Sequence, residues 1–472
     1  METQIAVLGG GPGGYAAAFL AADLGMKVTI VEAEARLGGT CLLKGCIPSK
    51  ALLHVARVLS ESKEMAEWGV GFGSPTIDVD VMRGRKDKVI KTLSDGLRQL
   101  AKQRKVEVIT AKATFENSTT LRLEGPGITD TRLTYETCVL ASGSIPAMPA
   151  PWRLPTDRVM DSTGALNLAD APESLLVIGG GYIGLEMGTV YAGLGTKVTV
   201  VEATPTLLPL ADRDLVKPLQ TRLTKLFSKI YLSTKVGSLT DRGNSIEVAL
   251  DGPDGVRTER FSRVLVSVGR RPNSAGLGLE RTHVQIDPKG FVITDDKQRT
   301  ADPHILAIGD VAGEPMLAHK ASHQGKVAIE ALHGEPAAFQ PACIPAIVFT
   351  DPEIAWAGLT EEEAKTQGIT VEVSKYPWAA SGRAQALGRT EGFTKFLVDP
   401  ASSRVLGVGI VGIGAGDLIS EAVLAIEMGA TVRDVAESIH PHPTLSETLA
   451  FAAEAYMGTA TEIYRPKTAK AH

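Results

Sequence analysis

Short apolar runs closed by glycine recur along the chain, and the first of them opens an alternation of strand and helix. Residues 5–8 are apolar, residues 9–14 are five glycines and a proline, and an alanine-rich helix is predicted from about 15 to 24. A second apolar strand over 27–31 ends at Glu32. Strand, glycine turn, helix, strand and acidic residue in this order are the dinucleotide-binding fingerprint in the context that it requires.

The same pattern returns in the middle of the chain. Apolar residues 175–178 precede the loop 179–184, a helix extends through about Leu194, and a strand over 197–201 ends at Glu202. In both units the acidic residue follows the first glycine by 23 positions, from 9 to 32 and from 179 to 202. One such motif is weak evidence, but two with matched spacing predict two dinucleotide sites. The alternative is a pair of tight turns without a ligand.

Three glycines in each loop have distinct predicted tasks. The first permits the tight turn, the second lets a pyrophosphate approach the backbone, and the third lets the helix pack closely on the strand. Amides at the helix N-terminus then hold the anion. These glycines are Gly9, Gly11 and Gly14 in the first unit and Gly179, Gly181 and Gly184 in the second.

Glu202 indicates which nicotinamide cofactor the second unit binds. A carboxylate at this strand end accepts hydrogen bonds from a ribose 2′-hydroxyl and repels a 2′-phosphate. Residues 203–206 contain no arginine that would hold such a phosphate. We therefore predict NAD rather than NADP, the alternative being a solvated glutamate at a strand end.

Later segments extend the two predicted sheets. Glycine-closed strands over 137–140 and 264–268 are expected to return to them, and a third strand over 305–308 is followed by Asp310. Asp310 either binds a ribityl hydroxyl or caps a helix. The proline-rich segment 145–155 is predicted to be a linker.

After about residue 345 the pattern changes to an α+β unit without a nucleotide fingerprint. Strands are predicted over 346–350, 371–376, 394–398 and 405–413, and helices over 417–428 and 444–457.

Length and composition fit a multidomain α/β enzyme. With about 150 residues per domain, 472 residues suggest roughly three domains. The 49 basic and 54 acidic side chains give a net charge of −5 without a strongly basic tract, which argues against a nucleic-acid partner. A strand at the very N-terminus leaves no room for a signal peptide, and no apolar stretch is long enough to span a membrane. With only four cysteines, this indicates a reducing, cytoplasmic compartment.

Two cysteines in the segment 38–50 indicate redox chemistry. Residues five apart in an α-helix have Cα atoms about 8.6 Å apart, whereas a disulfide needs less than about 6.8 Å. A Cys41–Cys46 bond therefore requires a distorted turn, which Gly45 and Pro48 allow. Strain of this kind marks a labile, catalytic bond rather than a structural one.

Two other interpretations of the cysteine pair stay open: two buried free thiols, or half of a metal site. Because Cys138 and Cys343 are isolated in the sequence, a four-cysteine zinc site is disfavoured.

A candidate base lies near the C-terminus, in the segment 440–447. Thr444 and Glu447 have the spacing of a capping box, which predicts that a helix opens there. Thiol–disulfide exchange needs a group that removes and returns a proton, and imidazole titrates in the right range. His442 could serve, with Glu447 orienting its ring. A histidine at a helix start is commonly structural, but cysteines that need a base favour the catalytic role.

Taken together, these motifs resemble the dihydrolipoamide dehydrogenases of the pyridine nucleotide-disulfide oxidoreductase family. The resemblance covers essentially the whole chain. It rests on GGTCLLKGCIPSKALLHVA, VIGGGYIGLEMGTVYAGLG, VSVGRRPN, AIGDVAGEPMLAHKA, FTDPEIAWAGLTEEEA, PWAASGRA and HPTLSE.

The resemblance implies an α/β fold with two Rossmann-like dinucleotide-binding domains, for FAD and NAD, and a C-terminal α+β dimerisation domain. The expected division is an FAD domain over 1–149 and 274–345, an NAD domain over 150–273 and an interface domain over 346–472. FAD would be held by Gly9, Gly11, Gly14, Glu32, Lys50, Gly143 and Asp310. NAD would be held by Gly179, Gly181, Gly184, Glu202 and Gly269, and Glu186 would pair with Lys50 near the flavin.

The resemblance also assigns the catalytic roles. Cys41 would be the interchange thiol and Cys46 the charge-transfer thiol. His442, paired with Glu447, would serve the disulfide of the partner subunit in a head-to-tail homodimer. The substrate would be a dihydrolipoamide carried by a 2-oxo acid dehydrogenase or glycine cleavage complex, and no metal is expected.

The sequence departs from the family at two places, and two other functions compete. Leu43 and Lys44 replace the usual Asn-Val or Asn-Arg, and Tyr182 stands where many members carry an aliphatic residue. One competitor is a related flavoprotein disulfide reductase that acts on another small disulfide, although no cysteine follows Cys343 to form a second redox pair. The other is a non-catalytic subunit of a multienzyme complex.

Overall fold

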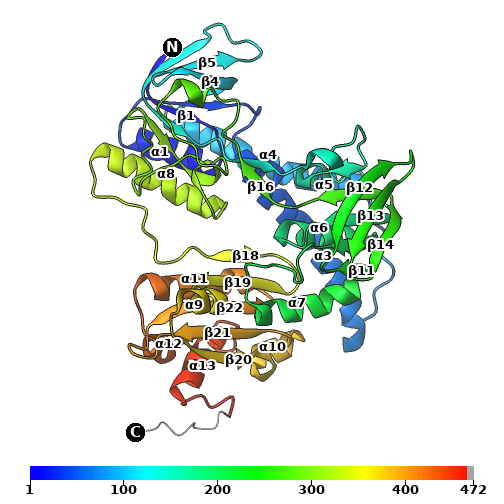
Figure 1. The fold of residues 1–472 in the computed structure, drawn as a ribbon. Helices are drawn as coiled ribbons and strands as arrows, with labels where there is room; N and C mark the ends of the chain where they lie inside the picture. The colour runs from blue at the N-terminus through cyan, green and yellow to red at the C-terminus, as the bar shows by residue number, and fades with distance from the viewer. Residues whose placement is uncertain (465–472) are drawn as a thin grey trace.

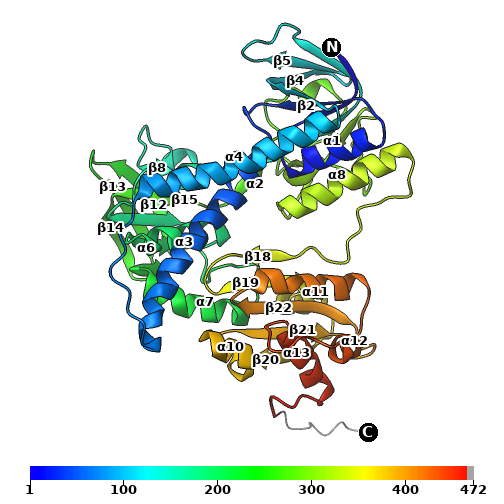
Figure 2. The same cartoon turned by 180° about the vertical axis from the view of Figure 1, so that it is seen from behind.

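A computed structural model describes residues 1–464 and contains three main β-sheets (Figures 1 and 2). Residues 465–472, which belong to the predicted interface domain, lie outside the described part. None of the helices formed by residues 1–464 combines the length and apolar character needed to cross a bilayer.

The first sheet has the strand order β3-β2-β1-β6-β5-β4, with β17 beside β6. Its strands are β1 (Glu2–Leu8), β2 (Val28–Glu32), β3 (Glu107–Thr110), β4 (Lys112–Asn117), β5 (Thr120–Glu124), β6 (Arg132–Leu140) and β17 (Ile305–Ala307). The associated helices are α1 (Pro12–Asp23), α2 (Gly39–Lys44), α3 (Cys46–Glu64), α4 (Val79–Gln103) and α8 (Ala318–His333). Strands β3, β2, β1, β6 and β17 are parallel neighbours, which is the arrangement that the predicted strands required. Helices α1 and α8 lie side by side against this sheet (Figures 1 and 2).

The second sheet is fully parallel, with the order β11-β10-β9-β15-β8. Its strands are β8 (Val159–Met160), β9 (Ser174–Ile178), β10 (Lys197–Val201), β11 (Lys229–Tyr231) and β15 (Arg263–Val266), and its helices are α5 (Ser162–Leu166), α6 (Tyr182–Gly193) and α7 (Arg213–Leu226). An antiparallel sheet of β12 (Lys235–Asp241), β13 (Ile246–Gly252) and β14 (Gly255–Phe261), which the sequence pattern did not predict, packs next to it.

The segment predicted as a proline-rich linker is partly structured. Residues Ser144–Pro146 form β7, which pairs antiparallel with β16 (Arg270–Pro272). The start of the predicted linker is thus a short strand, because a segment far along the chain supplies its hydrogen-bonding partner. This two-stranded ribbon connects the two nucleotide-type regions.

The third sheet is antiparallel, with the order β18-β19-β22-β21-β20. Its strands are β18 (Ala346–Val348), β19 (Glu353–Gly358), β20 (Glu372–Pro377), β21 (Phe393–Val398) and β22 (Val405–Gly412). Its helices are α9 (Glu361–Gln367), α10 (Gly382–Leu387), α11 (Ala415–Glu427), α12 (Val432–Glu437) and α13 (Glu447–Met457). Short 3-10 turns elsewhere cover Met65–Trp68, Ala150–Trp152, Leu279–Arg281, Gly309–Ala312 and Trp378–Ala380.

The predicted helix over 444–457 begins three residues later than expected, at Glu447. The carboxylate of Glu447 accepts a hydrogen bond from the Thr444 amide at 2.8 Å, but the Thr444 hydroxyl bonds the Pro441 carbonyl and the Ser446 hydroxyl instead of capping the helix. Only half of the capping box therefore forms, because the proline-held backbone competes for the threonine.

Buried contacts join the third sheet to the rest of the molecule. Leu52 of α3, Leu185 of α6 and Val348 of β18 belong to one apolar cluster. The ammonium of Lys395, which is fully buried, lies 2.7 Å from Asp212 and 2.6 Å from Glu361. Because Asp212 precedes α7, this ion cluster fixes the third sheet against the second.

Candidate active site

In both glycine loops, the first and third glycines have no room for a side chain. Gly9 and Gly179 have φ angles of 111° and 108°, a region that favours glycine. A Cβ at Gly14 or Gly184 would lie under 3.0 Å from the carbonyl oxygen of the first glycine of its own loop. Each helix can therefore approach its strand only because the third glycine lacks a side chain.

The carboxylate of an acidic residue accepts a hydrogen bond from each loop in the same way. Glu32 accepts the Gly10 amide at 2.7 Å, and Glu202 accepts the Gly180 amide at 2.7 Å. The second oxygen of each carboxylate accepts an amide two residues further along, at 2.8 Å in both cases. Both carboxylates thus stand at the loops with fixed orientation, which suits hydrogen bonding to a ribose.

Outside the loops, one further glycine follows the strand next to each loop-bearing strand. Gly143 follows β6 and Gly269 follows β15, and these strands are paired with the loop-bearing strands β1 and β9. Their φ angles are 71° and 117°, and a Cβ on either would meet no atom of residues 1–464 within 4 Å. Open space, loop amides and a carboxylate at each place fit two dinucleotides.

The cysteine pair lies where one helix stops and another starts. Helix α2 ends at Lys44, Gly45 adopts φ −148° and ψ −106°, and α3 begins at Cys46. This break brings the Cys41 and Cys46 side chains into hydrogen-bonding contact, which the ideal helix would prevent. Both thiols are free in this structure.

The two thiols differ in acidity. The hydrogen bond from Cys41 and the nearby Lys50 ammonium outweigh burial and lower the pKa of Cys46 to about 7. The same hydrogen bond, together with burial, raises the pKa of Cys41 far above its usual value. Cys46 is therefore the thiol that carries the negative charge near neutral pH.

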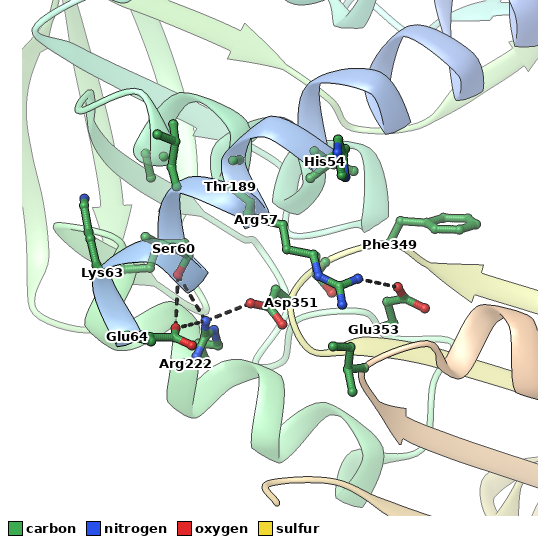
Figure 3. A pocket seen from close by; sticks show the side chains of 18 of the residues that line it. His54, Arg57, Ser60, Lys63, Glu64, Thr189, Arg222, Phe349, Asp351 and Glu353 are labelled. Atoms are coloured by element: carbon green, nitrogen blue, oxygen red, sulfur yellow. Dashed lines mark hydrogen bonds and ion pairs between the residues drawn. The ribbon is translucent and has the colours of Figure 1, made fainter. Parts of the chain in front are cut away.

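Lys50 stands one helical turn beyond Cys46. Its ammonium donates to Glu186 of α6 at 2.7 Å and lies 4.3 Å from the centre of the Phe349 ring. The sequence-predicted pair of Lys50 and Glu186 thus forms, with Glu186 almost fully buried. Lys50 also lines a cavity of about 470 Å³. Figure 3 shows that Arg57 of α3 pairs with Glu353 of β19 in this cavity.

Asp310 lies in the 3-10 turn Gly309–Ala312 and is not a helix cap. It accepts a hydrogen bond from the Ser144 hydroxyl at 2.5 Å, and Arg270 donates to the same hydroxyl at 2.7 Å. The capping alternative is wrong because the chain turns directly after the strand. Ser144 and Arg270, which the sequence reasoning did not single out, therefore connect Asp310 to the ribbon between the two nucleotide-type regions.

His442 and Glu447 come together as predicted. The His442 Nδ1 atom lies 2.9 Å from Glu447 Oε1, and the imidazole side chain is 78 % exposed. Helix α13, which follows His442, lies near the C-terminal end of the molecule, well away from α2 (Figure 2). Within one chain, the base and the thiols are therefore not brought together.

The residues at the two family departures are accommodated without distortion. Lys44 forms an ion pair with Glu34, so the unusual Leu43-Lys44 sequence completes α2 normally. Tyr182 is the first residue of α6 and is 41 % exposed, and burial of its hydroxyl raises its pKa to about 12.

Comparison with known proteins decides the family. A model described as pyridine nucleotide-disulphide oxidoreductase matches residues 3–325, and the dimerisation domain of the same family matches residues 344–453. The chain belongs to the pyridine nucleotide-disulphide oxidoreductase family.

Full-length relatives in this family share close to half of their residues with the chain. A dihydrolipoyl dehydrogenase of Vibrio parahaemolyticus is 45 % identical, and the match covers 100 % of this chain and 99 % of that protein. A dihydrolipoyl dehydrogenase of Geobacillus stearothermophilus is 42 % identical, with 98 % of each chain covered. Among solved structures, LpdA of Mycobacterium tuberculosis has a TM-score of 0.89 at 26 % identity, covering 96 % of this chain and 100 % of that one.

Proposed function

We propose that this chain is a dihydrolipoyl dehydrogenase, which oxidises protein-bound dihydrolipoamide to lipoamide and reduces NAD⁺ to NADH. The observation that carries the proposal is the contact of the Cys41 and Cys46 thiols at the Gly45 break, beside the Lys50–Glu186 ion pair. Two adjacent thiols of different acidity suit exchange with a dithiol substrate, because the more acidic one is the better leaving group. The full-length relatives that bear this name support the proposal.

The proposal assigns FAD to the first glycine loop and NAD to the second. Support comes from the twin loop geometry and from the absence of arginine over 203–206. In this assignment Gly9, Gly11, Gly14, Glu32, Lys50, Gly143 and Asp310 hold FAD, and Gly179, Gly181, Gly184, Glu202 and Gly269 hold NAD. The domain division in this proposal is the one expected from the sequence: 1–149 with 274–345 for FAD, 150–273 for NAD and 346–472 for the interface.

The thiol chemistry is derived from the chain's own groups. A substrate thiol loses its proton to His442 of the partner subunit, and the thiolate attacks the Cys41 sulfur of the oxidised pair. A mixed disulfide forms and Cys46 leaves as a thiolate. The second substrate thiol gives its proton to the departing Cys41 sulfur and attacks the substrate sulfur of that mixed disulfide. This step releases lipoamide and leaves Cys41 as a thiol and Cys46 as a thiolate. When bound, FAD supplies the route by which this electron pair reaches NAD⁺.

Catalysis in trans follows from the position of His442. Its exposed ring and the separation of α13 from α2 favour a homodimer in which each subunit serves the other's thiols. The match to a dimerisation domain over 344–453 supports that assembly. Glu447 would hold the imidazole by its Nδ1 atom, which leaves Nε2 for the substrate proton. The physiological substrates in this proposal are lipoyl-bearing proteins of 2-oxo acid dehydrogenase or glycine cleavage complexes, in the cytoplasm.

A matrix of assays tests the proposal. The purified dimer is assayed with NADH and NADPH, each against lipoamide and glutathione disulfide, after its flavin spectrum is recorded. We expect a flavin spectrum and turnover with NADH and lipoamide only. Preference for NADPH and glutathione disulfide would identify a different disulfide reductase, and a folded dimer without flavin or turnover would identify a non-catalytic subunit.

A further inference from the structure

One residue of the third sheet touches both members of the Lys50–Glu186 pair. Phe349 directly follows β18, and its backbone N–H donates to Glu186 Oε1 at 3.0 Å. Its ring lies 4.3 Å from the Lys50 ammonium, measured to the ring centre. Since Lys50 itself donates to the other carboxylate oxygen of Glu186, the three groups form a closed set of contacts.

These contacts come from three separate parts of the chain. Lys50 belongs to the helix that starts with Cys46, Glu186 to the helix after the second glycine loop, and Phe349 to the third sheet. Figure 3 shows Phe349 near the Arg57–Glu353 pair, which also ties α3 to the third sheet, at 3.8 Å. The third sheet is thus held at the position from which Phe349 reaches Lys50.

The Phe349 ring restricts where the Lys50 ammonium can go. Glu186 is 4 % exposed, whereas the side chain of Lys50 is 31 % exposed and has water on one side. An aromatic face attracts an ammonium through its quadrupole, and the attraction is largest where water is partly excluded. Without the ring, a long and flexible lysine side chain gains freedom to turn toward solvent.

We propose that Phe349 is a positioning residue that keeps the Lys50 ammonium beside the Cys46 sulfur, so that the third sheet sets how readily the thiolate forms. This inference rests on the proposed function, because it takes Cys46 to act as a thiolate. It adds a residue from outside both nucleotide-binding regions to the groups that control the thiol pair.

The charges around Cys46 explain why the position of Lys50 matters. The ionisable groups that act on or respond to this sulfur are Cys41 of α2, Tyr15 of α1, Lys50 of α3, and Tyr182 and Glu186 of α6. Lys50 is the only cation of this set within residues 1–464. The Cys41 hydrogen bond and the Lys50 ammonium lower the pKa of Cys46, while burial and the Glu186 carboxylate raise it. A displaced Lys50 would leave the Cys41 hydrogen bond as the only side-chain contact in this set that opposes the carboxylate.

The test compares four holoenzymes: the parent, Phe349→Leu, Phe349→Tyr and Phe393→Leu. Phe393 of β21 is a matched control, because it is also a phenylalanine of the third sheet with its ring near an ammonium. That ammonium belongs to Lys375, at 5.6 Å from the ring centre, and not to Lys50. Each protein is reduced with one equivalent of dithiothreitol, and the long-wavelength absorbance of the thiolate next to the flavin is followed against pH. Flavin content and circular dichroism establish that each variant is folded.

We expect Phe349→Leu to move the midpoint upward by about half a pH unit, which is roughly a threefold fall in the ratio of thiolate to thiol at the parent's midpoint. Phe349→Tyr, which keeps the aromatic face, and Phe393→Leu should match the parent. An unchanged midpoint in folded Phe349→Leu, or an equal shift in Phe393→Leu, overturns the inference but not the proposed function. If Phe349→Leu yields no folded flavoprotein, Phe349→Met makes the same comparison. A parent without the long-wavelength absorbance would instead contradict the proposed function.

Discussion

The glycine loops at 9–14 and 179–184 share their backbone but not their surroundings. Gly11 has φ −77° and ψ −175°, and Gly181 has φ −78° and ψ 175°. In each unit an amide from a later segment also donates to a loop carbonyl, from Gly38 to Gly10 at 2.9 Å and from Leu208 to Gly180 at 3.0 Å. The local sequence thus produces the same backbone conformation in both loops. We call each of these loops, 9–14 and 179–184, a nucleotide cradle.

What covers each cradle is different. In the first, a Cβ on Gly39 would lie 2.5 Å from Gly11, and a Cβ on Gly325 of α8 would lie 2.6 Å from the Gly13 carbonyl, so other segments press on the loop. In the second, a Cβ on Gly181 would meet no atom of residues 1–464 within 4 Å, and Tyr182 is 41 % exposed. We interpret the enclosed loop as suited to a retained cofactor and the open one to a cofactor that exchanges in each turnover.

The largest expected effect concerns the thiols, which only the first unit carries. Cys41 lies nine positions after Glu32 of the first unit. The corresponding position after Glu202 of the second unit is Ala211, so the second unit has no thiol there. Replacing Cys46 by Ser should abolish lipoamide turnover and the long-wavelength absorbance, because serine neither forms the disulfide nor ionises near neutral pH. Stopped-flow reduction and steady-state assays measure both, with Cys343→Ser as a control that should keep them. Residual turnover in Cys46→Ser would mean that electrons reach NAD⁺ without the pair.

A steric test separates the two loops. Gly14→Ala and Gly184→Ala each force a Cβ against a carbonyl oxygen of the same loop. Overpacking of this kind costs of order 1–3 kcal/mol, about 10–100-fold in binding. We expect Gly14→Ala to lose flavin on gel filtration, and Gly184→Ala to keep flavin but show a raised KM for NAD⁺. The reverse pattern would exchange the two assignments.

Charge removal at the second loop should have a smaller effect. Glu202→Ala deletes an acceptor for the ribose hydroxyls, a charge-assisted hydrogen bond worth about 1.5–3 kcal/mol, so KM for NAD⁺ should rise about tenfold or more. Because the repulsion of a 2′-phosphate also disappears, the preference for NADH over NADPH should narrow. Glu32→Ala is the matched variant and should lower flavin affinity while KM for NAD⁺ stays the same. An unaltered NADH preference in Glu202→Ala would show that another group selects the cofactor.

The smallest expected effect is the pH dependence of Cys46 ionisation, which concerns the first unit alone. The pKa of Cys46 is lowered to about 7, so its thiolate is present above that pH and is lost as the pH falls through it. The long-wavelength absorbance of the reduced holoenzyme should therefore increase with a midpoint near pH 7. Binding of NAD⁺ analogues to the second loop, followed by fluorescence, should show no transition there. A midpoint near the usual thiol value would mean that neither Cys41 nor Lys50 influences Cys46.

Much of this arrangement could be predicted from residues close together in the chain. The two loops, the strands that flank them, the break at Gly45 and the His442–Glu447 contact all depend on neighbours within about two dozen positions. Glycine conformations, apolar runs and proline constraints act over such distances, so the sequence pattern carries them. The start of α13 was missed because the Thr444 hydroxyl bonds the Pro441 carbonyl and the Ser446 hydroxyl instead of the helix N-terminus, a choice that spacing alone does not resolve.

The sequence by itself determined two nucleotide cradles, a thiol pair at a broken helix and a histidine–glutamate pair near the C-terminus. Only the tertiary structure decided which cradle is enclosed, that Phe349 reaches the Lys50–Glu186 pair, and that Arg270 supports Asp310 through Ser144. The physical reason is that most of these contacts join residues more than a hundred positions apart. Their geometry depends on how whole sheets pack against one another, and no local propensity encodes that.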